Sequence, residues 1–299
     1  MQAESIRSSG ADSADRLHRG LYEYYGSPWH DDDPNARLKQ MSIDEIAAVF
    51  DNIPPGVYPN ENSSPFFPMR TADLLELKQR RYLDYTGHHR HRFAADLMRF
   101  ADFHQRNSIY AGFGPFHPQT IPKPEDDERY GDDQAYALAQ FLYALKPPRN
   151  PNQPDDLSAA GKKVFEREGC GGCHTPPLYT NNKLTPVDGF SVPTDHPERA
   201  HIMPISVHTD PTNALKTRKG TGFYKVPSLL GVWFRGPYEH NGSVATLEDW
   251  FDAARLRNDY IPSGFKPYGV KTRAVRGHEF GLSLEPGDKS ALIAFLRTL

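Results

Sequence analysis

The sequence Cys170-Gly171-Gly172-Cys173-His174 contains both cysteines of the chain. Three chemistries use two cysteines separated by two residues: a redox disulfide, half of a zinc site, and covalent attachment of haem. A zinc site needs two further ligands, and 13 histidines in the chain keep a Cys2His2 site formally possible. A redox pair would follow a hydrophobic strand, whereas this pair follows the amphipathic, helix-like run 157–168, which disfavours that chemistry.

Covalent haem attachment gives each reactive group of this pentapeptide a role. Two thiols at this spacing can each add to one vinyl group of a porphyrin, and the adjacent histidine then supplies an axial nitrogen to the iron. Gly171 and Gly172 permit a tight backbone path between the two cysteines, although that path does not require glycine. We therefore predict one haem c, attached at Cys170 and Cys173 and bound axially by His174.

The composition excludes several classes of protein. The chain has 299 residues, a length that suggests about two domains. It contains no apolar run of the roughly 18 residues that a membrane-spanning helix needs, so we predict a protein that does not span a membrane. Lys and Arg total 35 against 38 Asp and Glu, which makes nucleic acid an improbable partner. The 27 Pro and 23 Gly residues predict long loops.

A proline-rich stretch divides the sequence. Residues 147–154 contain four prolines among polar residues, which predicts an extended spacer. We place the linker at 149–155, between an N-terminal module, 1–148, and a cytochrome c-like domain, 156–299. Because the N-terminal module contains no cysteine, we expect it to carry no covalent haem.

Amphipathic helices are expected at both ends of the C-terminal domain. In the run 158–165, Ser158 is the expected N-cap, and Ala159, Val164 and Phe165 lie near one face. The run 286–299 begins with Pro and an acidic residue. Its apolar positions at i, i+3, i+4 and i+7 are Leu292, Phe295, Leu296 and Leu299. We expect these two helices to pack together.

A third helix is predicted just before the linker. Residues 132–146 have an acidic first turn and a lysine in the last turn. The apolar side expected for this helix is formed by Leu138, Phe141, Leu142 and Leu145. We interpret the helix over 132–146 as the last helix of the N-terminal module.

Three histidines, His88, His89 and His91, resemble a metal or anion site. Helical spacing would present only two of them on one face, and neighbouring arginines repel a metal ion. We interpret this stretch as the basic start of a helix that continues over 93–103.

The C-terminal half resembles the haem domain of bacterial dihaem cytochrome c peroxidases, the rubber oxygenases and the dihaem maturation enzymes of amine dehydrogenases. The segments that carry the resemblance, about half of the chain, are Cys170–His174, Lys225–Trp233, Gly236–Glu248, Gly277–Gly281 and the terminal helix. The resemblance implies two haems, one for electron transfer and one where peroxide or dioxygen binds. This chain has one motif, so either another lies upstream of residue 1 or the N-terminal half has lost its haem.

The ligand opposite His174 decides whether the iron is a closed shuttle or an open catalytic centre. His278 stands between two glycines, which permit close backbone approach, and bis-histidine members of the family place a late histidine similarly. Met203, beside a proline, is the alternative and would raise the potential. His240 is expected to be structural, because the resemblance places its segment in a turn beside the haem. The remaining candidates are His201 and His208.

Arginines are expected to pair with the haem propionates, because a planar guanidinium matches a carboxylate. The candidates are Arg218, with its neighbour Lys219, and Arg235.

The sequence thus predicts a mostly α protein: a cytochrome c-like haem domain with long loops, preceded by a haem-free helical and irregular module. Its expected function is one-electron transfer to or from a redox partner protein. The alternatives are part of a dihaem peroxidase or oxygenase, and a haem-stabilised subunit of an oligomer or complex. Because covalent haem is normally attached outside the cytoplasmic membrane, we expect a periplasmic or exported protein, although Met1 to Ala14 show no signal peptide.

Overall fold

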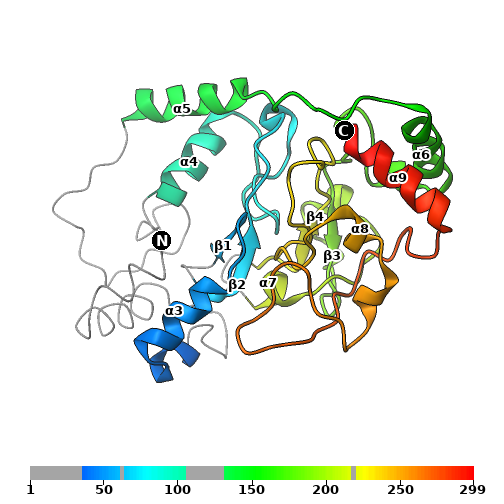
Figure 1. The fold of residues 1–299 in the computed structure, drawn as a ribbon. Helices are drawn as coiled ribbons and strands as arrows, with labels where there is room; N and C mark the ends of the chain where they lie inside the picture. Colours follow the sequence, from blue (N-terminus) through cyan, green and yellow to red (C-terminus); the bar gives the residue numbers. More distant parts are fainter. Residues whose placement is uncertain (1–35, 61–63, 106–130, 217–219) are drawn as a thin grey trace.

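Helices and long loops make up most of the fold (Figure 1). The structure is a computed structural model that describes residues 36–60, 64–105, 131–216 and 220–299. The α-helices are α3 (Ile43–Asp51), α4 (Ala94–Gln105), α5 (Asp132–Ala144), α6 (Asp156–Arg167), α7 (Thr212–Leu215), α8 (Leu247–Trp250) and α9 (Pro286–Arg297). The strands are β1 (Val57–Asn60), β2 (Ser64–Arg70), β3 (Leu184–Pro186) and β4 (Phe223–Lys225). The 3-10 turns are η1 (Ala36–Gln40), η2 (Leu77–Gln79), η3 (Cys170–Gly172), η4 (Arg199–His201) and η5 (Ala253–Leu256). The predicted mostly α class is confirmed.

Helix α6 begins one turn earlier than the expected cap. Asp155 is the N-cap and accepts a hydrogen bond from the Ser158 backbone N–H. The Ser158 side chain accepts one in return from the Asp155 N–H, completing a capping box. The prediction of Ser158 as N-cap is therefore wrong, because an aspartate three residues earlier satisfies the free N–H groups. Ala159 is also exposed rather than packed, whereas Val164 and Phe165 are buried as expected.

Helices α6 and α9 lie side by side, as predicted (Figure 1). Their closest approach is at Gly161, where an added Cβ would lie 1.8 Å from the carbonyl oxygen of Ala291. One turn further, the rings of Phe165 and Phe295 pack edge to face with centroids 5.3 Å apart. The predicted apolar stripe of α9 is confirmed, with Leu292, Phe295 and Leu296 buried and Leu299 partly buried. Glycine at 161 thus sets the spacing of the helix pair.

Helix α5 packs on α4 mainly through small residues, and the predicted apolar side is confirmed only in part: Leu142 packs against the same cluster, and Leu138 and Leu145 are partly buried. Ala135 and Ala139 are its buried positions, and Ala139 packs in one cluster with Leu97 of α4. Phe141, expected on the apolar side, is 61% exposed. The error arises because alanine permits close approach of the two helices, which turns the larger apolar side chain outward.

The histidine-rich stretch before α4 is not helical. Residues 86–93 form turns and bends, and α4 begins at Ala94. His91 is buried, with Nδ1 bonded to the Arg80 carbonyl at 2.8 Å and Nε2 to the Tyr143 hydroxyl at 2.6 Å. Within the described parts of the chain, no group of three or more His, Cys, Asp or Glu residues is placed to hold a metal ion. His91 is therefore a structural link rather than a ligand.

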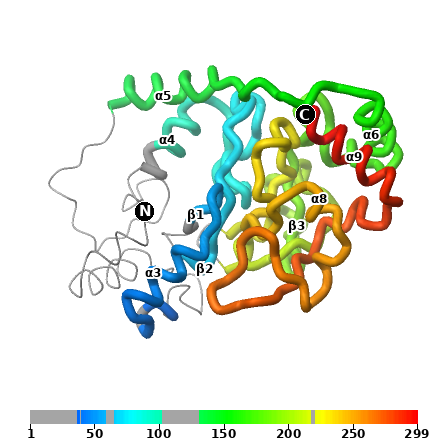
Figure 2. The backbone as a smooth tube through the Cα atoms, in the orientation of Figure 1, coloured from blue at the N-terminus to red at the C-terminus, as the bar shows by residue number. Residues whose placement is uncertain are grey.

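Segments far apart in sequence pack closely around the small sheets (Figure 2). Strand β1 pairs antiparallel with β2, and β3 pairs antiparallel with β4. The backbone of Lys225 donates to the Tyr85 carbonyl at 2.8 Å, and that of Arg70 donates to the His240 carbonyl at 2.8 Å. Apolar clusters are shared in the same way: Met69 and Tyr85 pack in one core cluster with residues of the C-terminal half. The N-terminal segment around β2 is thus part of the wall of the C-terminal half.

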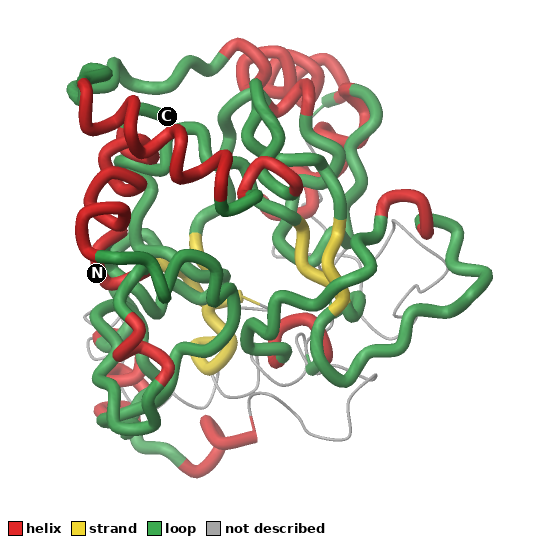
Figure 3. Tube along the Cα trace, turned by 90° about the vertical axis from the view of Figure 1, so that its right-hand side faces the viewer, coloured by secondary structure: helices red, strands yellow, loops and turns green. Residues whose placement is uncertain are grey.

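The connection between α5 and α6 has no regular structure, as the proline-rich composition predicts. Asn150 anchors it by donating from Nδ2 to the Arg297 carbonyl at 2.8 Å. The division into modules at 149–155 stays a prediction. Loops also form most of the chain between β3 and α9 (Figure 3). No helix in the described residues is long and apolar enough to cross a bilayer.

Replacing Gly161 with alanine should destabilise the fold, because the new methyl group must push α9 away from α6. We expect a loss of about 1 to 3 kcal/mol in the free energy of unfolding, measured by chemical denaturation of the holo-protein. The matched control is Gly287→Ala on α9, where an added Cβ meets nothing within 4 Å. An equal response of the two variants would show that the close helix approach does not limit stability.

Candidate cofactor site

A large cavity opens between the N-terminal segment and the loops of the C-terminal half. Its empty volume, with the open solvent at its mouth included, is about 1520 Å³. The predicted site residues that line it are Cys170, Cys173, His174, His278 and Arg235. Apolar side chains cover much of the remaining wall, among them Phe165, Val232, Leu247, Phe251, Leu292 and Leu296. The cavity therefore suits a large, mostly apolar group.

The two cysteines enter the cavity from the short turn η3. The backbone N–H of His174 donates to the Cys170 carbonyl at 2.8 Å, which closes the turn and brings the two cysteines and the histidine together. Burial raises the pKa of both thiols, and neither is in a disulfide. An added Cβ would meet nothing closer than 3.9 Å at Gly171 and nothing within 4 Å at Gly172, so neither glycine is sterically required.

His174 is held in one orientation by backbone carbonyls. Its Nδ1 lies 3.2 Å from the Tyr179 carbonyl oxygen and 3.1 Å from that of Pro227. Because a carbonyl only accepts, Nδ1 must carry the proton, and Nε2 keeps its lone pair. Burial lowers the pKa of His174, which favours the neutral imidazole that metal binding requires.

His278 faces His174 across the cavity. The ring centroids are 6.1 Å apart. Two metal–nitrogen bonds of about 2 Å each, plus the distance from each nitrogen to its ring centre, give a separation of this order. Burial lowers the pKa of His278 to about 4, and its Nδ1 has no hydrogen-bond partner among the described residues. The pair of neutral imidazoles fits one metal atom between them.

The backbone around His278 is fixed by its neighbours. Gly277 has a φ of 89°, and an added Cβ would lie 2.4 Å from the backbone of Thr209. Only glycine fits there, because L side chains disfavour this region and the space is filled. Arg255, 1% exposed, donates from Nε to the Trp250 carbonyl, from Nη1 to that of Val275 and from Nη2 to that of His278, at 2.7 to 2.9 Å. One buried guanidinium thus joins α8 to the His278 loop.

The other ligand candidates lie elsewhere. Met203 does not line the cavity, and its sulfur lies 3.3 Å from the amide Nδ2 of Asn181. His201 also lies outside the cavity wall, and His208 is exposed and pairs with Asp188 at 3.0 Å. Arg218, like Lys219, lies outside the described residues.

His240 lines the cavity as part of a buried acid–base pair. Its Nδ1 contacts a carboxylate oxygen of Glu239, and its ring stacks on Tyr224 with centroids 4.6 Å apart. Thr209 donates its hydroxyl hydrogen to the same carboxylate. Burial would raise the pKa of Glu239, but the His240 charge and these hydrogen bonds lower it to about 2. Burial likewise opposes the charge on His240, and Glu239 outweighs it, so the pKa of His240 is raised.

Sequence reasoning missed four polar residues at this site: Arg70, Lys225, Glu239 and Arg255. Lys225 and Glu239 lie inside segments that were singled out, but nothing in the spacing marked them individually. Arg70 and Arg255 reach the site through long-range folding, for which the sequence carries no local signal.

The chain resembles several known proteins. Residues 222–260 match the family described as RoxA-like, cytochrome c-like. The cytochrome-c peroxidase IdrP1 of Denitromonas iodatirespirans is 25% identical over 59% of this chain and 46% of its own length. The uncharacterized protein y4iJ of Sinorhizobium fredii is 32% identical over 25% of this chain and 18% of its own. The chain therefore spans less than half the length of these curated relatives.

A solved structure extends the likeness to the whole fold. A MauG-like protein associated with microbial copper homeostasis superposes with a TM-score of 0.50 at 15% identity. The match covers 97% of this chain and 88% of that structure. It shows that the arrangement of helices and loops is shared.

Replacing Glu239 with glutamine should weaken the fold in a pH-dependent way. The lowered pKa of Glu239 means that its contribution is complete above pH 4.5 and is lost as the pH falls towards about 2. The raised pKa of His240 means that its contribution is complete below pH 6.5 and is lost as the pH rises through the raised value. We expect Glu239→Gln to lose about 3 kcal/mol at pH 6, by denaturant unfolding, and less at pH 3. A loss that is equal at both pH values would contradict the ion pair.

Proposed function

We propose that this chain, a relative of the dihaem cytochrome c peroxidases, carries one covalent haem c and transfers single electrons through it. Cys170 and Cys173 would hold the haem through thioether bonds, and His174 and His278 would bind its iron. The observation that carries the proposal is the facing pair of imidazoles, with ring centroids 6.1 Å apart, in a cavity that is also lined by both cysteines. When bound, haem supplies a one-electron couple at its iron.

The residues of the chain have separate tasks in this proposal. Each cysteine sulfur would form one C–S bond to a vinyl carbon of the haem, and the thiol hydrogen would move to the other vinyl carbon. The carbonyls of Tyr179 and Pro227 hold His174 in the correct tautomer, and Arg255 positions the backbone of His278. The apolar wall excludes water, which limits the reorganisation that accompanies a change of charge.

Electrons enter or leave where the cavity reaches the surface. Phe280 lines the cavity, is 50% exposed and packs edge to face on His278 with centroids 5.2 Å apart. We propose that a redox partner protein docks near this edge. We also propose that the protein acts in the periplasm or outside the cell, because covalent haem attachment takes place there.

A second candidate function is half of a peroxidase. The peroxidase relative is more than twice as long as the part that this chain matches. In that case this chain would supply the electron-transfer half, and peroxide would be reduced at a second haem held outside it. Peroxide-dependent oxidation of a reduced cytochrome by the full-length gene product tests this function. No turnover by a protein with its full haem content would leave electron transfer as the function.

The proposed ligation predicts a specific response to His278→Gly. Glycine accepts the φ of 45° at this position, so the backbone is preserved while the imidazole is lost. We expect the purified variant to keep the mass of one attached haem, to lose the low-spin ferric spectrum and to bind cyanide. The wild-type protein should show a low-spin spectrum that cyanide alters little.

The matched control is His208→Gly. His208 also has a positive φ, of 58°, but its side chain is exposed and lies outside the cavity wall. Its low-spin spectrum should be unchanged. A low-spin spectrum retained by His278→Gly would rule out His278 and transfer the axial role to another residue, such as Met203. A wild-type mass without haem would overturn the proposed function itself.

A further inference from the structure

Four basic side chains gather where the N-terminal segment meets the cavity. This cationic cluster consists of Arg70 at the end of β2, Arg80 after η2, Lys225 at the end of β4, and Arg235. Arg70 and Arg80 are 8% and 7% exposed, and the side chain of Arg235 is 10% exposed. Buried cations are unfavourable unless anions or hydrogen bonds compensate them.

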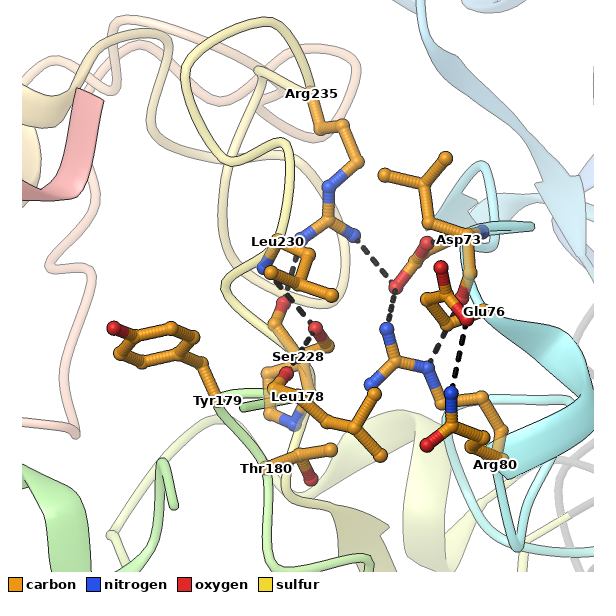
Figure 4. A network of polar contacts seen from close by, with 12 residues as sticks. Asp73, Glu76, Arg80, Leu178, Tyr179, Thr180, Ser228, Leu230 and Arg235 are labelled. Carbon is orange, nitrogen blue, oxygen red and sulfur yellow. Dashed lines mark hydrogen bonds and ion pairs between the residues drawn. The ribbon is translucent and has the colours of Figure 1, made fainter. Parts of the chain in front are cut away.

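The carboxylate lining this cluster belongs to Asp73. Its Oδ2 lies 3.0 Å from Arg235 Nη1 and 3.5 Å from Arg80 Nη2 (Figure 4). The negative charge of Glu76 favours the charged form of Arg80, and that of Asp84 favours the charged form of Lys225. Asp84 is already occupied by the Thr86 hydroxyl and the backbone N–H groups of the following residues. One shared carboxylate therefore serves the two buried guanidinium groups at the centre of the cluster.

Several nitrogen atoms of the cluster have no hydrogen-bond acceptor. Among the described residues, no acceptor reaches Arg235 Nε or Arg80 Nη1, although both atoms are buried. The remaining groups are directed by backbone carbonyls: Arg235 Nη2 donates to Ser228, and Lys225 Nζ to Tyr82 and Leu83. Arg70 donates from Nε to the Tyr85 hydroxyl at 2.7 Å. Buried donors without acceptors indicate that an anionic group completes the site.

The cluster is continuous with the proposed haem cavity. Arg70, Lys225 and Arg235 line the cationic pocket, and the same three residues line the large cavity together with the cysteines and both histidines. Arg80 and Asp73 line only the pocket. An anion bound by the three shared residues is therefore part of whatever fills the large cavity. The anionic substituents of haem are its two propionates.

We infer that Arg70, Lys225 and Arg235 bind the two haem propionates, an assignment that rests on the proposed function. Asp73 and Arg80 are positioning residues: Asp73 pairs with Arg235, and Arg80 pairs with Asp73. Sequence analysis expected Arg235 in this role, but the contribution of Arg70 and Lys225 comes from the fold. Because Arg70 lies on β2, the N-terminal segment supplies part of the cofactor site instead of serving only as a scaffold.

The assignment has a consequence for the redox couple. Reduction of the iron adds one negative charge to the haem, so nearby buried cations stabilise the reduced form. Burial lowers the pKa of Lys225 to about 8 in the protein without haem. Two haem propionates beside the Lys225 ammonium group would favour its charged form. Removing one cation should therefore favour the oxidised haem.

The test compares holo-protein variants in which one cation is removed. We expect Arg70→Gln, Lys225→Gln and Arg235→Gln each to lower the ratio of reduced to oxidised haem at a fixed potential about tenfold. This corresponds to a midpoint potential lower by about 59 mV for a one-electron couple. The propionate-bending bands in the resonance Raman spectrum should shift in the same variants. The matched control is Arg257→Gln, since Arg257 is an exposed arginine paired with Asp259, and it should change neither quantity.

The variant Arg70→Lys provides a second test in case the loss of the positive charge in Arg70→Gln prevents folding. It keeps the charge but not the planar fork, so its potential should stay near the wild-type value while the Raman bands shift. Wild-type potential and bands in Arg70→Gln, Lys225→Gln and Arg235→Gln, with haem attached and low-spin, would overturn the propionate assignment and leave the proposed function standing. A wild-type protein without attached haem would overturn the proposed function instead.

Discussion

The buried guanidinium of Arg255 is the interaction on which the geometry of the site depends most. Loops carry both facing histidines, and a loop without regular hydrogen bonding needs another source of rigidity. Arg255 provides it by donating to the carbonyls of Trp250, Val275 and His278. Its position is set in turn by η5 and by its cation–π contact over the Trp250 ring, 5.2 Å from the ring centre. The hydrogen bonds of one side chain thereby hold a loop that has no regular backbone hydrogen bonding.

The chain uses the same device on the other side of the cavity. The imidazole of His174 is oriented by two carbonyls, and Arg235 by the carbonyl of Ser228 and the carboxylate of Asp73. Polar side-chain contacts, most of them to backbone carbonyls, therefore fix both walls of a site that contains little regular structure. The helix pair α6 and α9 supplies the rigid reference, since Gly161 and Ala291 leave no free space between the helices.

The sequence was informative where function depends on residues close together in the chain. The spacing of Cys170, Cys173 and His174 singled out three residues that the structure brings together in one turn, and the apolar period of α9 predicted its buried face. Side chains whose environment depends on distant segments were not predictable in this way. Phe141 is exposed because α4 approaches the alanines of α5, and Arg70 reaches the cavity because β2 pairs with the backbone of His240. Neither the exposure of Phe141 nor the position of Arg70 can be predicted from the residues that neighbour it in the sequence.

The position of α9 after the attachment cysteines in the sequence has a consequence for biogenesis. Leu292 and Leu296 form part of the cavity wall, while the attachment cysteines are made much earlier during synthesis. The wall is incomplete until α9 has been translated and has docked. A nascent polypeptide that has not yet formed α9 therefore exposes the apolar side chains of the remaining wall to water.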